Sequence, residues 1–555
     1  VLYVNAGSTR NVAALDATTG QVLWLWRPQE GSRYDEAPRK GAGRGVAFYS
    51  NNGKTRVIDV TPGYQLVSLD AKTGLLDPTF GEKGVVDLFV GLRNADDPRF
   101  AHPDIGLSAP PFVMNDVIVV GAAHRTGGRP RAKSNVKGDI RGFDVHTGEL
   151  LWTFHTIPER GEVGYETWLD EGIEFTGNSG VWAPISGDPE LGLIYLPVED
   201  PTGDYYGGDR PGANLFSSSL VAVDVKTGER RWHFQQIHHD IWDWDVPAAP
   251  VLADLPNGRK IVMSVTKQAF VYTYDRLTGE PIWPIVERPV PAGDVPGEWY
   301  SPTQPFPTLP APFDRQTVTE DDLLDWSPEL RALALEATKG FRLSTVLYTP
   351  PSLTDAADGT RGLLSLPSST GGANWEGSTI DPETGILYVP SRTQLQMLTL
   401  AKNPDSDIAL SQGFGVRVPR IQGLEIVKPP YGRITAIDMN SGEHLWMIAN
   451  AATPEQIANH PLLEGIDIPD TGVPTRSGTL LTKTLLFVSE GNGTADARPM
   501  MRAINKQTGA LIAEIQLPAN QIGLPFTYEH AGKQYLALFV GGSGSPAELV
   551  AYALP

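Results

Sequence analysis

The eight residues from His238 to Asp245, HHDIWDWD, combine two histidines, two tryptophans and three aspartates. Three carboxylates this close raise one another's pKa unless a cation or hydrogen bonds compensate their charge. Such a group can supply a general base or bind a metal ion. The residues alone also allow a solvated surface loop whose tryptophans are tucked inward.

Other residues with chemical potential lie outside any hairpin pattern. Lys267 stands in an apolar run, IVMSVTKQAFVYTYD, where a lysine serves a site or extends its ammonium group to solvent. Arg44 lies in GAGRGVAFYS, whose glycines let the backbone come close to a bound group. Trp182 in TGNSGVWAPISGD, and Asn374 with Trp375 in GGANWEG, each follow a Gly-rich loop and precede a DPxxG turn. These two loops are expected to be equivalent, and each tryptophan either fills the core or supports a planar ligand.

The elements that must position these residues are repeated hairpins. Seven segments share one plan, in which an apolar strand reaches Asp or Asn, a turn closes on Gly and a second strand follows, usually with Trp or another apolar residue four positions later. The turn residues are Asp16, Asp70, Asp144, Asp224, Asp275, Asp438 and Asn505. Most intervals are about 50 to 80 residues, which is enough for one four-stranded sheet and its loops, as in the blades of a β-propeller.

Two irregularities fit the same fold. The long interval from Asp275 to Asp438 holds the motif DPETGILYVP, which resembles DPELGLIYLP from Asp188, and a Pro-rich insertion at about 284–351 with a helix-like piece, DLLDWSPELRALALEA. The C-terminal AELVAYALP is a strand without its turn, so strands from both chain ends could close one ring. We therefore predict an all-β protein in which residues 1–555 form a single eight-bladed β-propeller domain of four-stranded antiparallel blades.

The tryptophans of the hairpins recur at one place in the repeat. This regularity indicates packing of blade against blade rather than chemistry. The residues assigned to packing are Trp24, Trp152, Trp232, Trp283 and Trp446.

Composition excludes several classes of function. The net charge is −20, from 45 basic and 65 acidic residues, so we expect no nucleic-acid partner. The chain has no cysteine, which excludes disulfides, thiolate metal sites and haem attached through CxxCH. No window approaches the roughly 18–20 apolar residues of a membrane span. The chain begins on a strand-like run at Val1 and shows no signal peptide. The mature form of an exported protein, from which the signal peptide has been removed, would begin in the same way.

Together these motifs resemble the quinoprotein dehydrogenases. The resemblance rests on the DxxTGxxxW repeats, RGVAF, VWAPISGDPELGLIYLP, YYGGDRPGANL, HHDIWDWD with the lysine that follows it, GEWYSPTQPF and VAYALP. Members of this family are eight-bladed propellers that bind pyrroloquinoline quinone (PQQ) and a divalent cation on the central axis. The chain is most similar to the glucose-dehydrogenase type, without its membrane anchor.

The resemblance implies how PQQ, a planar ortho-quinone with three carboxylates, is held. Trp182 matches the tryptophan on which the ring stacks, and Arg44 matches the arginine that binds a carboxylate. Lys267 matches the cation that bonds the quinone oxygens and stabilises negative charge on them. The further cofactor contacts that the resemblance implies are Ser108, Asn374 and Trp375.

For the chemistry, the resemblance implies Asp243 as the catalytic base, with Lys267 beside it. The base takes the hydroxyl proton of an alcohol while hydride passes from the carbinol carbon to the quinone. A calcium ion polarises the quinone carbonyl, and the implied ligands are Asp200, Asp243 and Thr126. Asp200 stands where the family usually has asparagine.

The chain departs from the family pattern in three places. Pro38 and Arg39 occupy the positions of a vicinal disulfide that many alcohol-oxidising members have, which favours the glucose-dehydrogenase branch. Tyr49 stands where that branch has a histidine, which argues against glucose as the substrate. The acidic or amide cation ligand after the VVG strand is missing, and GAAHRTGG leaves Thr126 or His124 at about that place.

We therefore predict a periplasmic PQQ- and calcium-dependent dehydrogenase that oxidises an alcohol or sugar hydroxyl to a carbonyl. Its electrons pass to a separate acceptor such as a cytochrome c or a quinone. One alternative is a non-catalytic scaffold propeller of the outer-membrane assembly type, which gives no reason for Asp243, Lys267 and Arg44 to coexist. A glycan-hydrolysing propeller is a further alternative, but it leaves Lys267 and Arg44 without roles.

Overall fold

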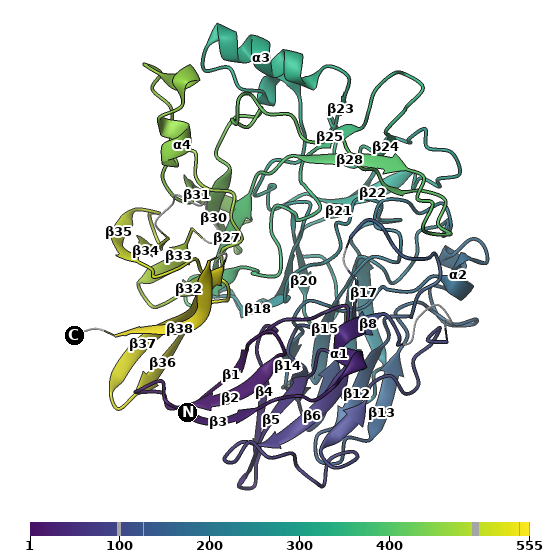
Figure 1. The fold of residues 1–555 in the computed structure, drawn as a ribbon, viewed down its shortest axis with the longest axis vertical. Coiled ribbons are helices and arrows are strands. Elements are labelled where there is room, and N and C mark those ends of the chain that lie inside the picture. The colour runs from purple at the N-terminus through teal and green to yellow at the C-terminus, as the bar shows by residue number, and fades with distance from the viewer. Residues whose placement is uncertain (97–101, 126, 491–498, 543, 554–555) are drawn as a thin grey trace.

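The computed structural model describes residues 1–96, 102–125, 127–490, 499–542 and 544–553. These residues form an all-β protein whose sheets are mostly antiparallel, and many of the sheets have four strands (Figure 1). The four-stranded antiparallel sheets are built from β4 (Ala47–Asn51), β5 (Lys54–Val60), β6 (Gln65–Asp70) and β7 (Val85–Asp87); β9 (Phe112–Met114), β10 (Val117–Val120), β12 (Ile140–Asp144) and β13 (Leu150–Phe154); β14 (Ser186–Asp188), β15 (Leu193–Val198), β16 (Ser219–Asp224) and β17 (Arg230–Gln235); β26 (Thr379–Asp381), β27 (Ile386–Arg392), β30 (Gly432–Asp438) and β31 (Glu443–Ala449); and β32 (Thr479–Leu481), β33 (Leu485–Ser489), β34 (Met500–Asn505) and β35 (Leu511–Gln516).

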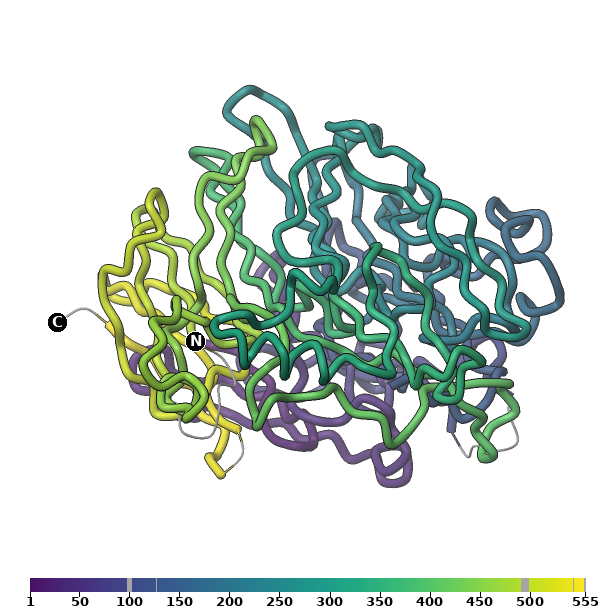
Figure 2. The backbone as a smooth tube through the Cα atoms, turned by 90° about the horizontal axis from the view of Figure 1, so that it is seen from above, coloured from purple at the N-terminus to yellow at the C-terminus, as the bar shows by residue number. Residues whose placement is uncertain are grey.

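Antiparallel sheets of three strands stand at the two ends of the chain and in its middle. They are built from β1 (Leu2–Ala6), β2 (Asn11–Leu15) and β3 (Val22–Trp26); β18 (Val251–Asp254), β19 (Lys260–Val265) and β20 (Val271–Asp275); and β36 (Phe526–His530), β37 (Lys533–Gly542) and β38 (Ser545–Ala553). The first and last of these sheets are neighbours, because Tyr528 on β36 donates a hydrogen bond of 2.8 Å to the carbonyl of Ala17. Figure 2 shows both chain ends on the same side of the molecule.

Neighbouring sheets meet through their first strands. β4 contacts β9, β14 contacts β18, β18 contacts β26, and β26 contacts β32. The hydrophobic core is divided into clusters between successive sheets, and one such cluster joins side chains of β10, β12 and β13 to those of β15 and β16. Loops that lead into the first strands therefore come close together at one end of the sheets.

The repeated hairpin turn forms as the sequence predicts. In the first copy the Asp16 carboxylate accepts hydrogen bonds from the backbone of Thr18 and Thr19, at 2.9 and 2.8 Å. The amide of Gly20 donates to the Asp16 carbonyl at 2.9 Å, and Gly20 has a φ of 72°, which a glycine adopts without strain. The Asp and the Gly of each repeat are thus explained by local backbone geometry.

The hairpin tryptophans pack against the next hairpin, as predicted. Trp24 donates a hydrogen bond of 3.0 Å to the carbonyl of Ala71, and its ring covers Gly74 so closely that a Cβ there would lie 2.5 Å from it. Trp152 meets Gly228 in the same way, at 2.6 Å. Gly74 and Gly228 are therefore required twice, by their own backbone angles and by the tryptophan of the preceding hairpin, whereas Gly20 is required by its backbone alone.

The Pro-rich insertion contains a hairpin of β21 (Ile285–Pro289) and β22 (Thr303–Pro307), and then the predicted helix, α3 (Pro328–Thr338). Ser327 caps α3 by accepting the amide of Leu330, and proline follows at the first helical position. The elements that surround the insertion or lie elsewhere are β23 (Arg342–Leu343), β24 (Ser352–Leu353), β25 (Leu363–Ser365), β28 (Gln396–Ala401), β29 (Ser411–Gln412), β8 (Ile105–Gly106), β11 (Ala123–His124), α1 (Ser32–Glu36), α2 (Gly172–Phe175) and α4 (Glu455–Ala458). Among the helices of the described residues, none has the length and apolar character needed to cross a bilayer.

Candidate functional site

A cavity of about 420 Å³ opens where the loops before the first strands meet. The predicted residues that line it are Arg44, Trp182, Asp200, Asp243, Lys267 and Asn374. Arg44 precedes β4, Trp182 precedes β14, and Asn374 precedes β26. The structure therefore brings together side chains that lie up to 330 positions apart in the sequence, counted from Arg44 to Asn374.

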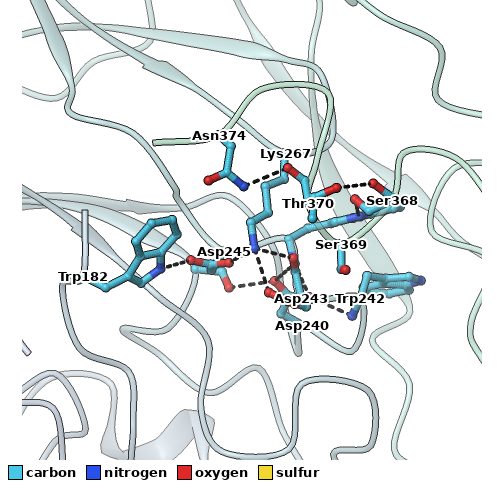
Figure 3. A network of polar contacts seen from close by, with 12 residues as sticks. Trp182, Asp240, Trp242, Asp243, Asp245, Lys267, Ser368, Ser369, Thr370 and Asn374 are labelled. Atoms are coloured by element: carbon cyan, nitrogen blue, oxygen red, sulfur yellow. Dashed lines mark hydrogen bonds and ion pairs between the residues drawn. The ribbon is translucent and has the colours of Figure 1, made fainter. Parts of the chain in front are cut away.

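Asp243 and Lys267 form the centre of the polar network (Figure 3). The ammonium group of Lys267 donates to the carboxylate of Asp243 at 2.7 Å and to the Asp243 carbonyl at 2.8 Å. Asp243 has a φ of 57°, which turns its backbone so that both acceptors face the same lysine. Lys267 lies in the turn between β19 and β20.

Asp245 connects this pair to the aromatic wall. One of its carboxylate oxygens accepts a hydrogen bond from Lys267, and the other accepts the indole N–H of Trp182 at 2.5 Å. Asp245 and Lys267 are 2% and 4% exposed, so water competes little for these contacts. The orientations of Trp182 and of the Lys267 ammonium group are therefore fixed together.

A second set of oxygens suits a cation. Ligand atoms of Glu199, Asp200 and Asp245 lie within 4.8 Å of one another, and all three residues are buried. Within the described part of the chain, buried oxygen atoms of Glu199, Asp200 and Asn178 have no hydrogen-bond partner. Calcium binds six to eight oxygen ligands, mainly carboxylates and amide or backbone carbonyls. These orphaned oxygens fit such an ion.

Burial makes the carboxylates of this wall costly to ionise. Burial raises the pKa of Asp200 well above its ordinary value, and the nearby charge of Asp204 adds to the effect. Burial also raises the pKa of Asp204, to about 7, and that of Asp243 well above its ordinary value, although Lys267 opposes both shifts. A bound cation would reverse these shifts by stabilising the ionised carboxylates.

Arg44 and Arg476 also line the cavity, and Arg44 lies against two tryptophans. The Arg44 guanidinium carbon lies 4.9 Å from the ring centre of Trp182 and 4.7 Å from that of Trp375. Burial and the nearby charge of Arg39 lower the pKa of Arg44 to about 9. Arg476 donates to the side-chain oxygen of Asn374 at 2.8 Å. A flat, multiply anionic ligand would find both aromatic surface and cationic partners here.

Two predicted positions among the described residues, Trp375 and Ser108, do not line the cavity. The carbonyl of Ser108 accepts the amide N–H of Arg44 at 2.9 Å, but Ser108 is not one of the described residues that line the cavity. Thr126 lies outside the described residues. His124, the alternative to Thr126, is buried with its Nδ1 atom 4.0 Å from the Glu199 carboxylate. The cation wall thus contains a glutamate where the family's usual ligand is missing.

The rest of HHDIWDWD holds the loop in place. Asp240 accepts the backbone N–H groups of Trp242 and Trp244, and its side chain also bonds Ser218. The two indole rings stack with their centres 5.6 Å apart within the core. The buried His239 contacts the carboxylate of Glu298 at 3.0 Å. These contacts anchor the segment that delivers Asp243 and Asp245.

Sequence reasoning missed several residues of the cavity wall, among them Glu199, Asp204, Tyr205, Asp245 and Arg476. Position in the repeat could have identified Arg476, because it precedes β32 by three residues, as Arg44 precedes β4. Glu199 adjoins a predicted ligand, Asp200, at the end of β15. Asp243, which the resemblance also implies as a ligand, lies outside the group of three carboxylates but is two residues from Asp245.

Comparisons with known proteins identify the family of the chain. Residues 1–536 match the family described as PQQ, the glucose/ethanol/alcohol dehydrogenase β-propeller domain. The chain is similar to the glycerol dehydrogenase large subunit of Gluconobacter thailandicus, with 32% identity over 98% of this chain and 76% of that protein. It is also similar to the quinoprotein glucose dehydrogenase of Escherichia coli, with 30% identity over 98% of this chain and 70% of that protein.

Further relatives extend this comparison. The quinate/shikimate dehydrogenase (quinone) of Acinetobacter baylyi is 29% identical over 98% of this chain and 70% of its own length. Among solved structures, a quinohemoprotein alcohol dehydrogenase of Pseudomonas putida superposes with a TM-score of 0.66 and 23% identity, covering 100% of this chain and 72% of its own. This last likeness concerns the fold.

Proposed function

The chain belongs to the family of PQQ-dependent glucose, ethanol and alcohol dehydrogenase β-propellers, and on that premise we propose that it oxidises an alcohol or sugar hydroxyl to a carbonyl with PQQ and calcium. The family predicted from the sequence motifs is thereby confirmed, and the chain is a quinoprotein dehydrogenase. The observation that carries the proposed chemistry is the Asp243–Lys267 pair, which borders one cavity with Trp182 and the orphaned oxygens of Glu199 and Asp200.

Asp243 is the proposed base. Its carboxylate lines the cavity and is fixed by Lys267, so that it can accept the hydroxyl proton of a bound alcohol. PQQ, when bound, supplies the quinone that accepts hydride from the carbinol carbon. The substrate loses one proton and one hydride and becomes the carbonyl product. Lys267 supplies positive charge where negative charge develops.

The calcium ion is assigned to the buried carboxylates. Glu199, Asp200 and Asp245 would hold it, and the family's remaining implied ligands are Asp243 and Thr126. The orphaned oxygen of Asn178 is a further oxygen donor on the same wall. For the cofactor we propose Trp182 as the platform and Arg44 with Asn374, Trp375 and Ser108 at its edge, joined by Arg476. The ring itself would lie against Trp182.

We propose that the sheets are the blades of one eight-bladed ring formed by a single domain of residues 1–555. This is supported by the repeated tryptophan contacts between hairpins and by the hydrogen bond from Tyr528 to Ala17, which connects the last sheet to the first. Under this arrangement β36–β38 and β1–β3 complete the ring.

Electrons must leave the reduced cofactor after each turnover. The chain has no cysteine for covalent haem attachment, so we propose a separate acceptor, a cytochrome c or a quinone, and a periplasmic location like that implied by the resemblance. The non-catalytic scaffold is not favoured, because it assigns no role to Asp243, Lys267 and Trp182. The relatives include glycerol, glucose and quinate dehydrogenases, so we propose a substrate that carries an alcohol or sugar hydroxyl.

Reconstitution tests this proposal. The full chain is incubated with PQQ and calcium, and reduction of an artificial electron acceptor is followed with glycerol, glucose, quinate and simple alcohols. We expect substrate-dependent reduction that requires both additions. Absence of PQQ binding at micromolar concentration would overturn the proposal, and PQQ binding without turnover on any hydroxyl substrate would count for the scaffold alternative.

A further inference from the structure

Arg210, in the motif YYGGDRPGANL, is an arginine buried beneath the site. It is 1% exposed and is not one of the described residues that line the cavity. Its guanidinium donates to the carbonyls of Thr202 at 3.3 Å, Gly203 at 2.9 Å and Asp240 at 2.6 Å. It also donates to the side-chain oxygen of Asn214 at 2.8 Å. One planar group therefore cross-links two stretches of backbone and the side chain of Asn214.

The stretches that Arg210 joins are the ones that carry the site carboxylates. Segment 199–204 supplies Glu199, Asp200 and Asp204, and segment 240–245 supplies Asp243 and Asp245. Ligand atoms from both segments lie within 4.8 Å of one another in the Glu199, Asp200 and Asp245 group. The two segments are well separated in the sequence, and the Arg210 guanidinium contacts the backbone of both. These contacts help to set the distance between the segments.

Repulsion between like charges opposes this close approach of the carboxylates. Like-charged carboxylates that face one another in a buried wall repel, and the repulsion is strongest before any cation is bound. Burial lowers the pKa of Arg210, and the charges of Asp200, Glu298 and Asp240 oppose this shift. The Arg210 charge therefore lies close enough to act on this wall. A fixed cation behind the wall offsets the repulsion without occupying the ligand position.

We propose that Arg210 is a positioning residue that holds the two carboxylate-bearing segments at the spacing a cation requires. The proposal rests on the proposed function, because it presumes that Glu199, Asp200 and Asp245 bind the metal ion. Arginine is specifically needed, since its rigid fork reaches carbonyls in different directions, whereas a lysine ammonium group is a point donor on a flexible stem. Residues of this kind behind a metal site tune affinity for the ion.

The test compares Arg210→Lys with a matched control, Arg141→Lys. Arg141 on β12 is also buried, at 3% exposure, and also donates to two backbone carbonyls, those of Val90 and Leu88, but it is not among the described residues of the cavity. Calcium binding to the full chain with saturating PQQ is measured by titration calorimetry. Thermal unfolding is recorded with and without calcium.

We expect Arg210→Lys to weaken calcium binding roughly 10- to 100-fold, the range for residues behind metal ligands. Arg141→Lys should keep the wild-type dissociation constant while losing a comparable amount of thermal stability. Turnover of Arg210→Lys should return at high calcium, which a general loss of structure would not allow. If Arg210→Lys does not fold, Asn214→Gly is the second variant, because Asn214 has a φ of 59° that glycine tolerates, and it should weaken calcium binding in the same direction.

The outcomes separate the two proposals. Wild-type calcium affinity in Arg210→Lys, or an equal loss of affinity in Arg141→Lys, would overturn the positioning role and leave the proposed function intact. Failure of the wild-type chain to bind calcium in the presence of PQQ would instead overturn the proposed cation site.

Discussion

Replacing Asp243 by asparagine tests the role of this residue in proton transfer while leaving the fold nearly unchanged. The amide oxygen of the introduced side chain would keep an acceptor for Lys267, which now donates to the carboxylate at 2.7 Å, and the carbonyl contact at 2.8 Å is unaffected. Asparagine tolerates the left-handed backbone found there, with a φ of 57°. The amide can also donate toward the hydroxyl of Tyr205, 3.4 Å from the present carboxylate. Fold and cofactor binding should therefore survive.

The amide cannot accept the substrate proton at neutral pH. A positioned general base contributes about 10²- to 10⁴-fold in rate, so kcat of Asp243→Asn should fall by that factor, equivalent to about 3–5 kcal/mol in the activation free energy. The assay is reduction of an artificial acceptor by enzyme loaded with PQQ and calcium. PQQ affinity is measured in parallel by titration and should stay near the wild-type value.

Asp240→Asn is the control in the same loop. Asp240 accepts the amides of Trp242 and Trp244, so its replacement should lower stability more than it lowers kcat. Turnover of loaded Asp243→Asn close to that of the wild type would show that Asp243 is not the base. If Asp240→Asn bound PQQ normally but lost more turnover than Asp243→Asn, Asp240 would take its place.

Packing and charge elsewhere in the chain lead to three other expected outcomes. Trp182→Ala should weaken PQQ binding, measured by titration, with little effect on the stability of distant blades. Trp152→Ala should instead cost about 3–5 kcal/mol in the free energy of unfolding, measured by denaturation, and leave PQQ affinity unchanged. Gly74→Ala should destabilise more than Gly20→Ala in denaturant titrations: both have a positive φ, but only at Gly74 would the new Cβ meet a tryptophan ring, at 2.5 Å. Burial raises the pKa of Asp59 to about 7, so the folded protein keeps a proton that the unfolded chain releases near pH 4. The free energy of unfolding should therefore fall as the pH rises from about 4 to 7. This group contributes at most about 4 kcal/mol to that fall. Asp59→Asn should remove that part of the pH dependence of stability, as measured by urea titrations at several pH values. An unchanged dependence of stability on pH in this variant would contradict the assignment to Asp59.

The repeated hairpins were predictable because their determinants are local. Asp16 and Gly20 meet within one turn, and their roles follow from backbone angles that any isolated copy would need. The tryptophan position also repeats, so its docking on the next turn glycine could be inferred from regularity alone. The strands of the long interval after Asp275 were less predictable, since β23, β24 and β28 pair across distant segments and partly in parallel.

The site was predictable only in part, because its residues belong to different sheets. Asp243, Lys267, Arg44 and Trp182 were found through motifs whose family roles are known, and the structure brings all four to one cavity. No periodicity marks Glu199, because it directly follows β15, a strand whose side chains are all buried. Its importance emerges only from the position of Asp245, which approaches it from another loop.

HHDIWDWD shows why crowding of carboxylates was informative but incomplete. From the sequence, one aspartate was expected to act in catalysis and the rest of the loop to support it. In the fold, each of the three aspartates has a different environment. Asp240 accepts amides and orders the turn, Asp243 faces the cavity with Lys267, and Asp245 divides its two oxygens between Lys267 and Trp182. Asp245 also approaches Asp200, so it connects the base, the aromatic platform and the proposed cation ligands. A change at Asp245 should therefore disturb all three, whereas the main effect of a change at Asp243 should be on proton transfer.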